Sequence, residues 1–127
     1  MAQSFAQKLN LKPGKTLALI NPPQDMAALL AGLLPENPLI QSLPEQAEGV
    51  LVFLTRQDEA GLLPGIYTRL RAGGLAWAAY PKGGSKVPTD LNRDILWKLI
   101  EPLGWRPVRM VALDETWSAM RFRREEG

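Results

Sequence analysis

Continuous apolar runs alternate along the chain with segments whose apolar residues recur at helical spacing. Residues 16–20, 49–55 and 75–80 carry apolar side chains at nearly every position. This pattern is typical of strands that are covered on both faces, as in a parallel sheet. Prolines at 22–23 and at Pro81 end the first and third runs, because proline cannot continue a central strand. The runs therefore predict the centre of a buried sheet.

Helical segments connect these strands. Ser4 is expected to cap a short helix before the first strand, and residues 25–34 place their apolar side chains on one side of a second helix. Pro64 interrupts the segment after the second strand, so two short helices are expected to meet there. The glycine pair at 73–74 is expected to end the second of these helices.

The C-terminal part combines the most regular helix with a hairpin. Apolar residues recur at helical spacing over 91–103, and Thr89 or Asp90 is the expected N-cap. Residues 108–113 and 117–122 alternate in character around a short polar turn, which predicts an antiparallel hairpin.

The order of these elements predicts an α/β fold. Parallel strands joined by right-handed helical crossovers form a three-layer, Rossmann-like and mostly parallel sheet, to which the C-terminal antiparallel hairpin is added. The stretch 35–48 supplies at most a short edge strand at 39–41. Trp77 and Tyr80 are expected to pack in the core. The length of 127 residues fits one domain spanning 1–127.

Composition excludes several chemistries. The sequence contains no cysteine and no histidine, so thiol nucleophiles, disulfides, Cys/His zinc sites and imidazole proton transfer are excluded. Its longest apolar runs are much shorter than the roughly 20 residues of a membrane helix. We see no signal-peptide pattern at the N-terminus, so we expect a cytoplasmic protein.

The net charge of +2 is a weak argument for nucleic-acid binding. The basic excess lies in residues 81–127, where nine basic residues face seven acidic ones. Arg121, Arg123 and Arg124 contribute to it, but Glu125-Glu126 follows them directly. Arg121 and Arg123 alternate with apolar residues and are expected on the outward face of the last strand, with partner binding as an alternative role.

Longer motifs carry two resemblances. Residues 62–64 and 70–77, a proline turn and a glycine pair before an apolar strand, resemble the segment leading into the fifth strand of class I S-adenosylmethionine-dependent methyltransferases. The segments 77–82 (WAAYPK), 87–91 (VPTDL) and 113–118 (LDETWS) together resemble DUF3052, a family of small bacterial proteins of unknown function. The first resemblance implies a truncated methyltransferase-like fold, and the second implies no activity.

The resemblance to methyltransferases does not extend to the cofactor turn. In those enzymes the first strand runs into a glycine-rich turn, and an acidic residue ends the second strand. Here residues 21–25 (NPPQD) follow the first strand and include no glycine. Prolines donate no backbone hydrogen bond, so a nucleotide-like ligand would need a different cradle.

Candidate ligand-binding residues follow the predicted strands, because ligands bind beyond the carboxyl ends of parallel strands in open α/β sheets. Loop 81–86 combines lysines, glycines and a hydroxyl in front of a predicted helix, which suits an anion, although a solvated surface loop explains it as well. Among Asp90, Asp114 and Glu115, one could act as a general base or several could hold a metal. The alternatives are helix capping for Asp90 and turn formation for Asp114 and Glu115. Trp117 is either a pocket wall or a core cover. The full candidate set is Asn21, Arg56, Lys82, Ser85, Lys86, Thr89, Asp90, Asp114, Glu115 and Trp117, with no metal site and no assigned catalytic residue.

Three classes of function stay open. The first is a non-catalytic or regulatory module that acts through self-association as a homodimer or through a protein partner. The second is a binder of, or enzyme for, an anionic and nucleotide-like small molecule of the S-adenosylmethionine type at the carboxyl ends of the strands. Nucleic-acid binding comes last, because no unanswered basic stripe is visible in the sequence.

Overall fold

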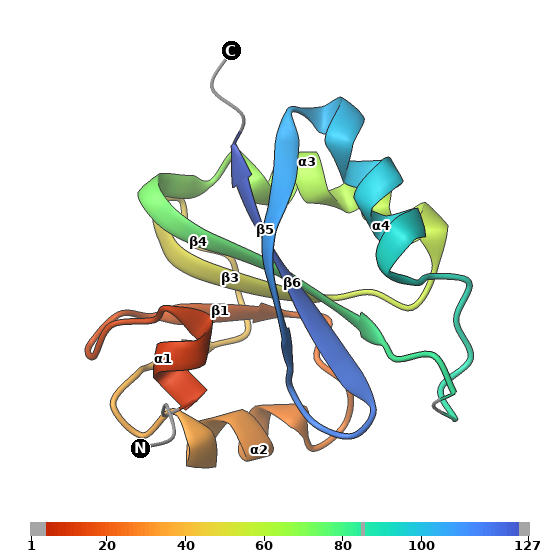
Figure 1. Ribbon diagram of the computed structural model, residues 1–127. Coiled ribbons are helices and arrows are strands. Elements are labelled where there is room, and N and C mark those ends of the chain that lie inside the picture. Colours follow the sequence, from red (N-terminus) through yellow and green to blue (C-terminus); the bar gives the residue numbers. More distant parts are fainter. Residues whose placement is uncertain (1–4, 85, 125–127) are drawn as a thin grey trace.

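The computed structural model describes residues 5–84 and 86–124, which form a six-stranded sheet in the order β2-β1-β3-β4-β6-β5 (Figure 1). Strands β1 to β4 are parallel, and β6 runs antiparallel to both β4 and β5. The predicted mostly parallel sheet with a C-terminal antiparallel hairpin is therefore confirmed. The strands are β1 (Leu17–Ile20), β2 (Leu39–Ile40), β3 (Ala47–Phe53), β4 (Leu70–Pro81), β5 (Trp105–Ala112) and β6 (Trp117–Arg124).

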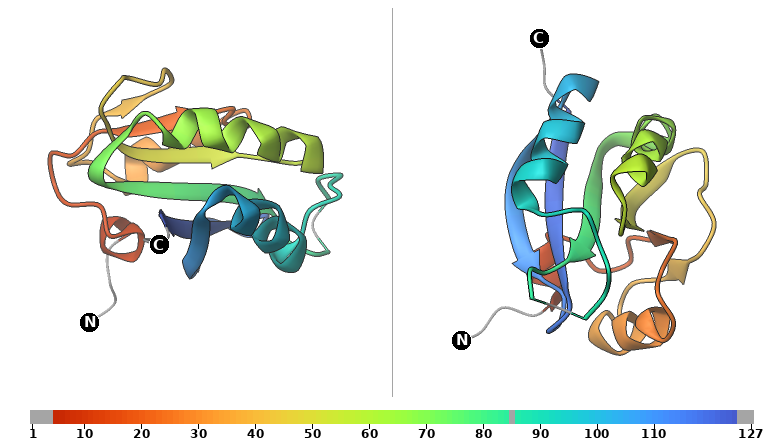
Figure 2. Two further views of the ribbon diagram at one scale, coloured as in Figure 1. Left: turned by 90° about the horizontal axis from the view of Figure 1, so that it is seen from above. Right: turned by 90° about the vertical axis from the view of Figure 1, so that its right-hand side faces the viewer.

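Helices cover both faces of the sheet, which gives the predicted three layers (Figures 1 and 2). On one face lie α1 (Phe5–Leu9) and α2 (Met26–Leu33). On the other lie the 3-10 helix η1 (Gln57–Leu62), α3 (Leu63–Tyr67) and α4 (Arg93–Ile100), which continues into η2 (Glu101–Leu103). As predicted, two short helices meet beside Pro64. Within residues 5–84 and 86–124, the helices are too short to span a membrane.

Alternation along the central strands feeds two hydrophobic cores. In β3, Val50 and Val52 face α3 and α4, whereas Leu51 and Phe53 face α1 and α2. Burial of each such side chain contributes about 1.5–3 kcal/mol to folding. All four are essentially inaccessible to solvent, which explains why this strand reads as a continuous apolar run.

Both aromatic side chains of β4 that were expected in the core are buried there. Trp77 is fully buried, and its indole Nε1 donates a hydrogen bond of 3.1 Å to the carbonyl oxygen of Leu9. This bond anchors the end of α1 to the centre of the sheet. Tyr80 is buried on the opposite face, so the prediction of core packing is confirmed for both residues.

The glycine pair at 73–74 does not end a helix, and that prediction is wrong. Helix α3 already ends at Tyr67, and β4 begins at Leu70. Leu70 pairs with Ala47 while Leu75 pairs with Gly49, so the extra residues of β4 bulge out of the ladder. Gly73 has a φ of 79°, a left-handed conformation that glycine adopts without steric cost.

The proline-rich stretch before β3 is fixed by one buried polar residue. The side-chain amide of Asn37 donates hydrogen bonds to the carbonyl oxygens of Lys12 (2.8 Å) and Lys15 (2.9 Å). Two residues later, Leu39 and Ile40 pair with the start of β1. The expected short edge strand is confirmed, and Asn37 holds it beside the turn that precedes β1.

Tyr67 provides a test of the packing on the α3 side. Its ring is buried against Trp105 and Phe122, and its hydroxyl has no hydrogen-bond partner among the described residues. An unpaired buried hydroxyl costs about 1–3 kcal/mol, so Tyr67→Phe should raise the free energy of unfolding by about 1 kcal/mol in urea titrations at pH 7.

The same substitution should change the alkaline limb of stability. Burial raises the pKa of Tyr67 above its ordinary value of 10.0. The folded protein therefore keeps this hydroxyl protonated while the unfolded chain ionises, so stability is full below pH 10 and falls as the pH rises above it. Tyr67→Phe should show a smaller fall between pH 9 and 11. An equal or lower stability of the variant at pH 7 would contradict an unpaired hydroxyl.

Candidate functional site

The carboxyl edge of the sheet, where β1, β3 and β4 end, gathers most of the residues that the sequence nominated. In open α/β sheets this edge is the usual ligand site. Asn21 follows β1, Arg56 follows β3, and Lys82 follows β4. The turn between β5 and β6 brings Asp114 and Glu115 to the same edge. Ser85 lies outside the described residues.

The turn after β1 has few donors to offer a ligand. Asn21 and Asp25 adopt left-handed conformations with φ values of 56° and 69°, and the two residues at 22–23 are prolines without an N–H. The amide of Met26 donates to the carbonyl oxygen of Pro23 at 3.0 Å. The backbone therefore turns sharply into α2 without presenting the row of free amides that an anion at a glycine-rich turn requires.

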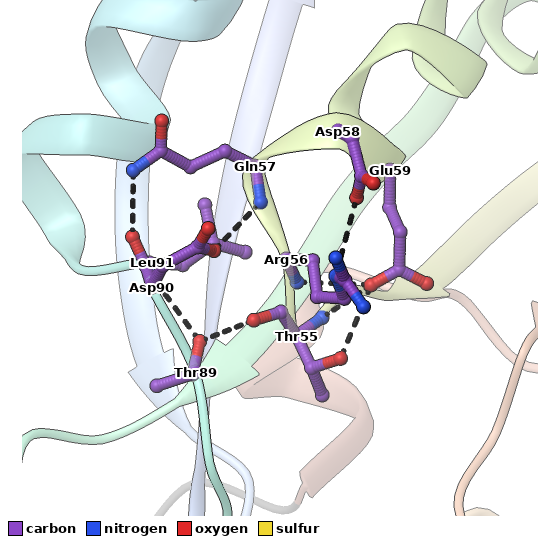
Figure 3. Close-up of polar contacts among 8 residues, drawn as sticks. All are labelled: Thr55, Arg56, Gln57, Asp58, Glu59, Thr89, Asp90 and Leu91. Atoms are coloured by element: carbon purple, nitrogen blue, oxygen red, sulfur yellow. Dashed lines mark hydrogen bonds and ion pairs between the residues drawn. The ribbon is translucent and has the colours of Figure 1, made fainter.

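The end of β3 is organised by a carboxylate that the sequence analysis did not single out. Glu59 Oε1 accepts hydrogen bonds from the amides of Thr55 and Arg56, both at 2.9 Å, and from the Thr55 hydroxyl at 3.1 Å (Figure 3). These bonds fix the start of η1. Arg56 itself points into solvent, where its Nε forms an exposed ion pair with Asp58 at 3.6 Å.

Thr89 and Asp90 fasten the segment after β4 onto the end of β3. The Thr89 hydroxyl donates to the carbonyl oxygen of Thr55 at 2.6 Å, and the Asp90 amide donates to the same oxygen at 3.3 Å. Gln57 donates two hydrogen bonds to Asp90. Its backbone amide donates to Asp90 Oδ1 (2.7 Å), and its side-chain Nε2 donates to the Asp90 carbonyl oxygen (2.9 Å) (Figure 3). The carboxylate of Asp90, a candidate general base, therefore already accepts a hydrogen bond from the backbone of the same protein.

Neither Thr89 nor Asp90 caps the following helix, so that prediction is wrong. Helix α4 begins at Arg93, and the side chain of Asn92 accepts the capping bond from the Ile95 amide at 2.8 Å. All three residue types are good caps. Thr89 and Asp90 form long-range hydrogen bonds with the residues after β3, so neither is placed to cap α4. Asn92 is therefore the N-cap.

Asp114 is a turn residue. Its Oδ1 accepts hydrogen bonds from the amides of Thr116 (2.8 Å) and Trp117 (2.7 Å), which closes the turn between β5 and β6. Trp117 is buried and packs edge to face on Phe53, with ring centroids 5.3 Å apart. Asp114 was a candidate general base or a turn residue, and the structure places it in the turn. Trp117 was a candidate pocket wall or a cover of the core, and the structure places it over the core. Glu115 is exposed.

Lys82 borders a cavity of about 390 Å³ beside the end of β4. The other lining residues lie on the end of β4, the start of α4 and β6, and the sequence analysis did not nominate them as ligands: Tyr80, Gly83, Asn92, Arg93, Asp94 and Ser118. Burial raises the pKa of Tyr80, an effect that Arg93 opposes and Asp94 adds to. In the sequence, the polar residues 92–94 could have indicated this cavity, because they interrupt the apolar pattern next to a predicted helix start. Lys86 is exposed and is not among the lining residues.

The structure therefore brings only part of the predicted set together. Thr89 and Asp90 bond to Thr55 and Gln57, the residues on either side of Arg56, while Lys82 lines the cavity beside β4. No group of three or more carboxylates placed to hold a metal ion occurs in the part of the chain that the structure describes. The arrangement places two cations (Lys82 and Arg93), a phenol (Tyr80) and a carboxylate (Asp94) around one cavity. Asp90, Glu59 and Asp114 instead accept hydrogen bonds from backbone amides.

Comparisons by sequence find no relative. No protein-family model matches the chain, and no curated protein matches it either. The resemblance to DUF3052 is therefore not supported by the family comparison.

Comparison by structure is informative about the fold. A S-adenosylmethionine-dependent methyltransferase from Aquifex aeolicus matches with a TM-score of 0.63 at 12% identity, over 91% of this chain and 85% of that one. The DhpI complex with SAH matches with a TM-score of 0.55 at 12% identity, over 88% and 77% of the two chains. A ribosomal protein L11 methylase from Lactobacillus delbrueckii subsp. bulgaricus matches at 0.56 and 8% identity, over 94% and 74%. The chain has the methyltransferase-like Rossmann fold; identities this low carry no information on activity.

The bonds of Asp90 make a testable difference to stability. Asp90→Ala leaves the Gln57 amide without its acceptor, so the free energy of unfolding should fall by about 1 kcal/mol. Asp90→Asn keeps a side-chain oxygen at the same position and should lose less than half of that. Urea denaturation of the two variants measures both values. Wild-type stability in Asp90→Ala would show that Asp90 does not hold this segment.

Proposed function

We propose that this chain is a non-catalytic module of methyltransferase-like fold that acts through a partner. One observation carries the proposal: the three carboxylates that organise the loops of the carboxyl edge accept hydrogen bonds from backbone amides of the same chain. Asp90, Glu59 and Asp114 each accept backbone amides, and the Thr89 hydroxyl is held by the end of β3. A catalytic carboxylate must instead reach the proton of a bound substrate.

The turn after β1 supports the same reading. Its prolines remove two amide donors at the position where a glycine-rich turn would approach a nucleotide. The absence of cysteine and histidine from the sequence leaves few side chains that transfer protons near neutral pH.

A second candidate function is the binding of a ligand of the S-adenosylmethionine type. The observation in its favour is the fold, because matching structures include complexes with SAH and with SAM. The cavity beside β4 contributes Lys82 and Arg93, which would attract a carboxylate, and its volume lies near the lower end of the range for small-molecule sites. In this alternative the ligand would occupy the carboxyl edge next to β4.

Calorimetric titration with S-adenosylmethionine and with S-adenosylhomocysteine separates the two functions. The non-catalytic module should bind neither at about 1 mM, and its Tm should not move. A true ligand at about 100 times its Kd adds roughly 2.7 kcal/mol, which raises the Tm of a domain of this size by several degrees. Saturable binding that Lys82→Ala/Arg93→Ala abolishes without loss of stability would establish the second function and reject the first.

For the partner, the open edge of the sheet is the surface that we propose. Strand β5 ends the sheet, and its Val108 and Met110 are each 40% exposed. An open edge strand with exposed apolar side chains favours pairing with another chain. We therefore expect a homodimer in light scattering at high protein concentration. A monomer under those conditions would exclude self-association and leave a different protein as the partner.

A further inference from the structure

Four arginines share one face of the β5–β6 hairpin. Arg106 lies opposite Arg123, and Arg109 lies opposite Arg121. Residues directly opposite each other in an antiparallel pair project to the same face, and Arg121 and Arg123 are two residues apart on one strand. The β5 residues 106 and 109 reach this face together because the ladder shifts register between Pro107 and Arg109.

Arg121 is held in this group at an energetic disadvantage. Its Nε is buried and has no hydrogen-bond partner among the described residues. Burial lowers the pKa of Arg121, and repulsion by Arg123 and Arg109 lowers it further. Like charges placed opposite each other in a sheet are destabilising, and so is a buried donor without an acceptor. An anion beside Arg121 would remove both penalties.

Arg121 also faces the amino edge of the sheet, where β1, β3 and β4 begin. Because β6 runs antiparallel to β4, Arg121 and Phe122 lie opposite Trp77 and Ala76, at the end of the shared ladder that is closest to the bulge of β4. A cavity of about 310 Å³ at this edge is lined by Lys12 and Lys15 from the turn before β1, by Arg71 from the bulge of β4, and by Arg121. The bulge contributes the backbone of Gly73-Gly74 to the same wall.

One carboxylate, that of Glu48, lines this cavity, and it is already paired with two of the basic side chains. Glu48 forms ion pairs with Lys15 at 3.1 Å and with Arg71 at 3.8 Å. The hydrogen bond from Lys15 is the main cause that lowers the pKa of Glu48, followed by the bond from the Thr16 amide. Four basic side chains therefore surround a single negative charge, which leaves a local excess of positive charge next to the unsatisfied Arg121.

We infer that this cavity, bounded by Lys12, Lys15, Arg71 and Arg121, is a binding site for a small phosphate-bearing ligand. A phosphate ester carries more than one negative charge and several acceptor oxygens, so it matches the excess of cations better than a single carboxylate does. Its position is the amino edge, opposite the edge that the fold makes the usual ligand site. The site is independent of the function proposed above, because it shares no residue with the carboxyl edge.

A small ligand fits the surface better than a nucleic-acid strand does. Binding of single strands normally combines a basic groove with exposed aromatic side chains on which bases stack. Among the described residues, Trp97 is the exposed large aromatic side chain, and it lies on α4, which covers the opposite face of the sheet from the arginines. The arginine face therefore supplies charge without a stacking platform.

Pyrophosphate is the probe, and Arg121→Met is the diagnostic variant. Methionine keeps a long side chain but removes the charge and the unsatisfied donor. The wild-type Tm should rise with pyrophosphate in a saturable way, and the affinity should fall as salt is added. Without ligand, Arg121→Met should melt at a higher temperature than the wild type. Its affinity for pyrophosphate in calorimetric titration should be at least tenfold weaker.

Two further variants control for charge and for folding. Arg93→Met makes the same charge change at the carboxyl edge and should bind pyrophosphate within twofold of the wild type. Glu48→Gln removes the competing carboxylate and should bind more tightly. Wild-type affinity in Arg121→Met would overturn the inference, and loss of binding in Arg93→Met alone would move the phosphate to the cavity beside β4.

A second probe identifies the source of the phosphate. A single-stranded thymidine oligonucleotide should bind no more tightly than pyrophosphate at equal salt. Much tighter binding of the oligonucleotide, with a steep salt dependence, would make a nucleic-acid backbone the ligand and overturn the assignment to a small molecule. Failure of either probe leaves the titrations with S-adenosylmethionine unaffected, so the two proposals stand or fall separately.

Discussion

The direction of β6 beside β4 is the constraint on which the arrangement of this molecule depends. Strand β4 pairs in parallel with β3 on one side and antiparallel with β6 on the other. Its buried residues, with Trp77 bonded to the end of α1, contact elements on both faces of the sheet. Because β6 runs antiparallel to β4, its first residue, Trp117, lies at the carboxyl edge, whereas Arg121 and Arg123 line cavities with the first residues of β4 at the amino edge. One reversal thus gives the two edges different chemistry.

The elements that could be predicted are those whose signal is local. The apolar runs of β1, β3 and β4 identify the buried strands directly, since covering both faces leaves no polar position. The capping residue of α4 could not be read in the same way. Thr89, Asp90 and Asn92 are equally suited to the task, and the decision rests on a bond to Thr55, 34 residues earlier in the chain.

The sites show the same limit more strongly. Sequence spacing placed Asp90 and Asp114 at the carboxyl edge, where the structure also has them, but it could not show that backbone amides occupy their oxygens. Of the arginine face, the sequence predicted Arg121 and Arg123 on one side of the last strand but did not predict Arg106 and Arg109 beside them. Arg106 and Arg109 are three residues apart, a spacing that puts side chains on opposite faces of a regular strand. Only the register shift beside Pro107 brings them to one side. A proline in a strand is compatible with an edge strand as well as with a bulge, so its presence alone does not predict the shift.

These features separate fold from function in a physical way. The methyltransferase-like sheet determines where edges, crossovers and helix termini lie, and it does so at sequence identities near 12%. What an edge can bind depends on whether its polar groups already have partners. At the carboxyl edge Asp90 and Asp114 accept backbone amides, which stabilises the loops and occupies the carboxylate oxygens that a ligand would need. At the amino edge Arg121 is buried without a partner among repelling charges. A buried charge without a partner destabilises the free protein, and a bound anion would remove that destabilisation. An unsatisfied charge is therefore a stronger indicator of a binding site than the edge of the sheet at which ligands usually bind in this fold.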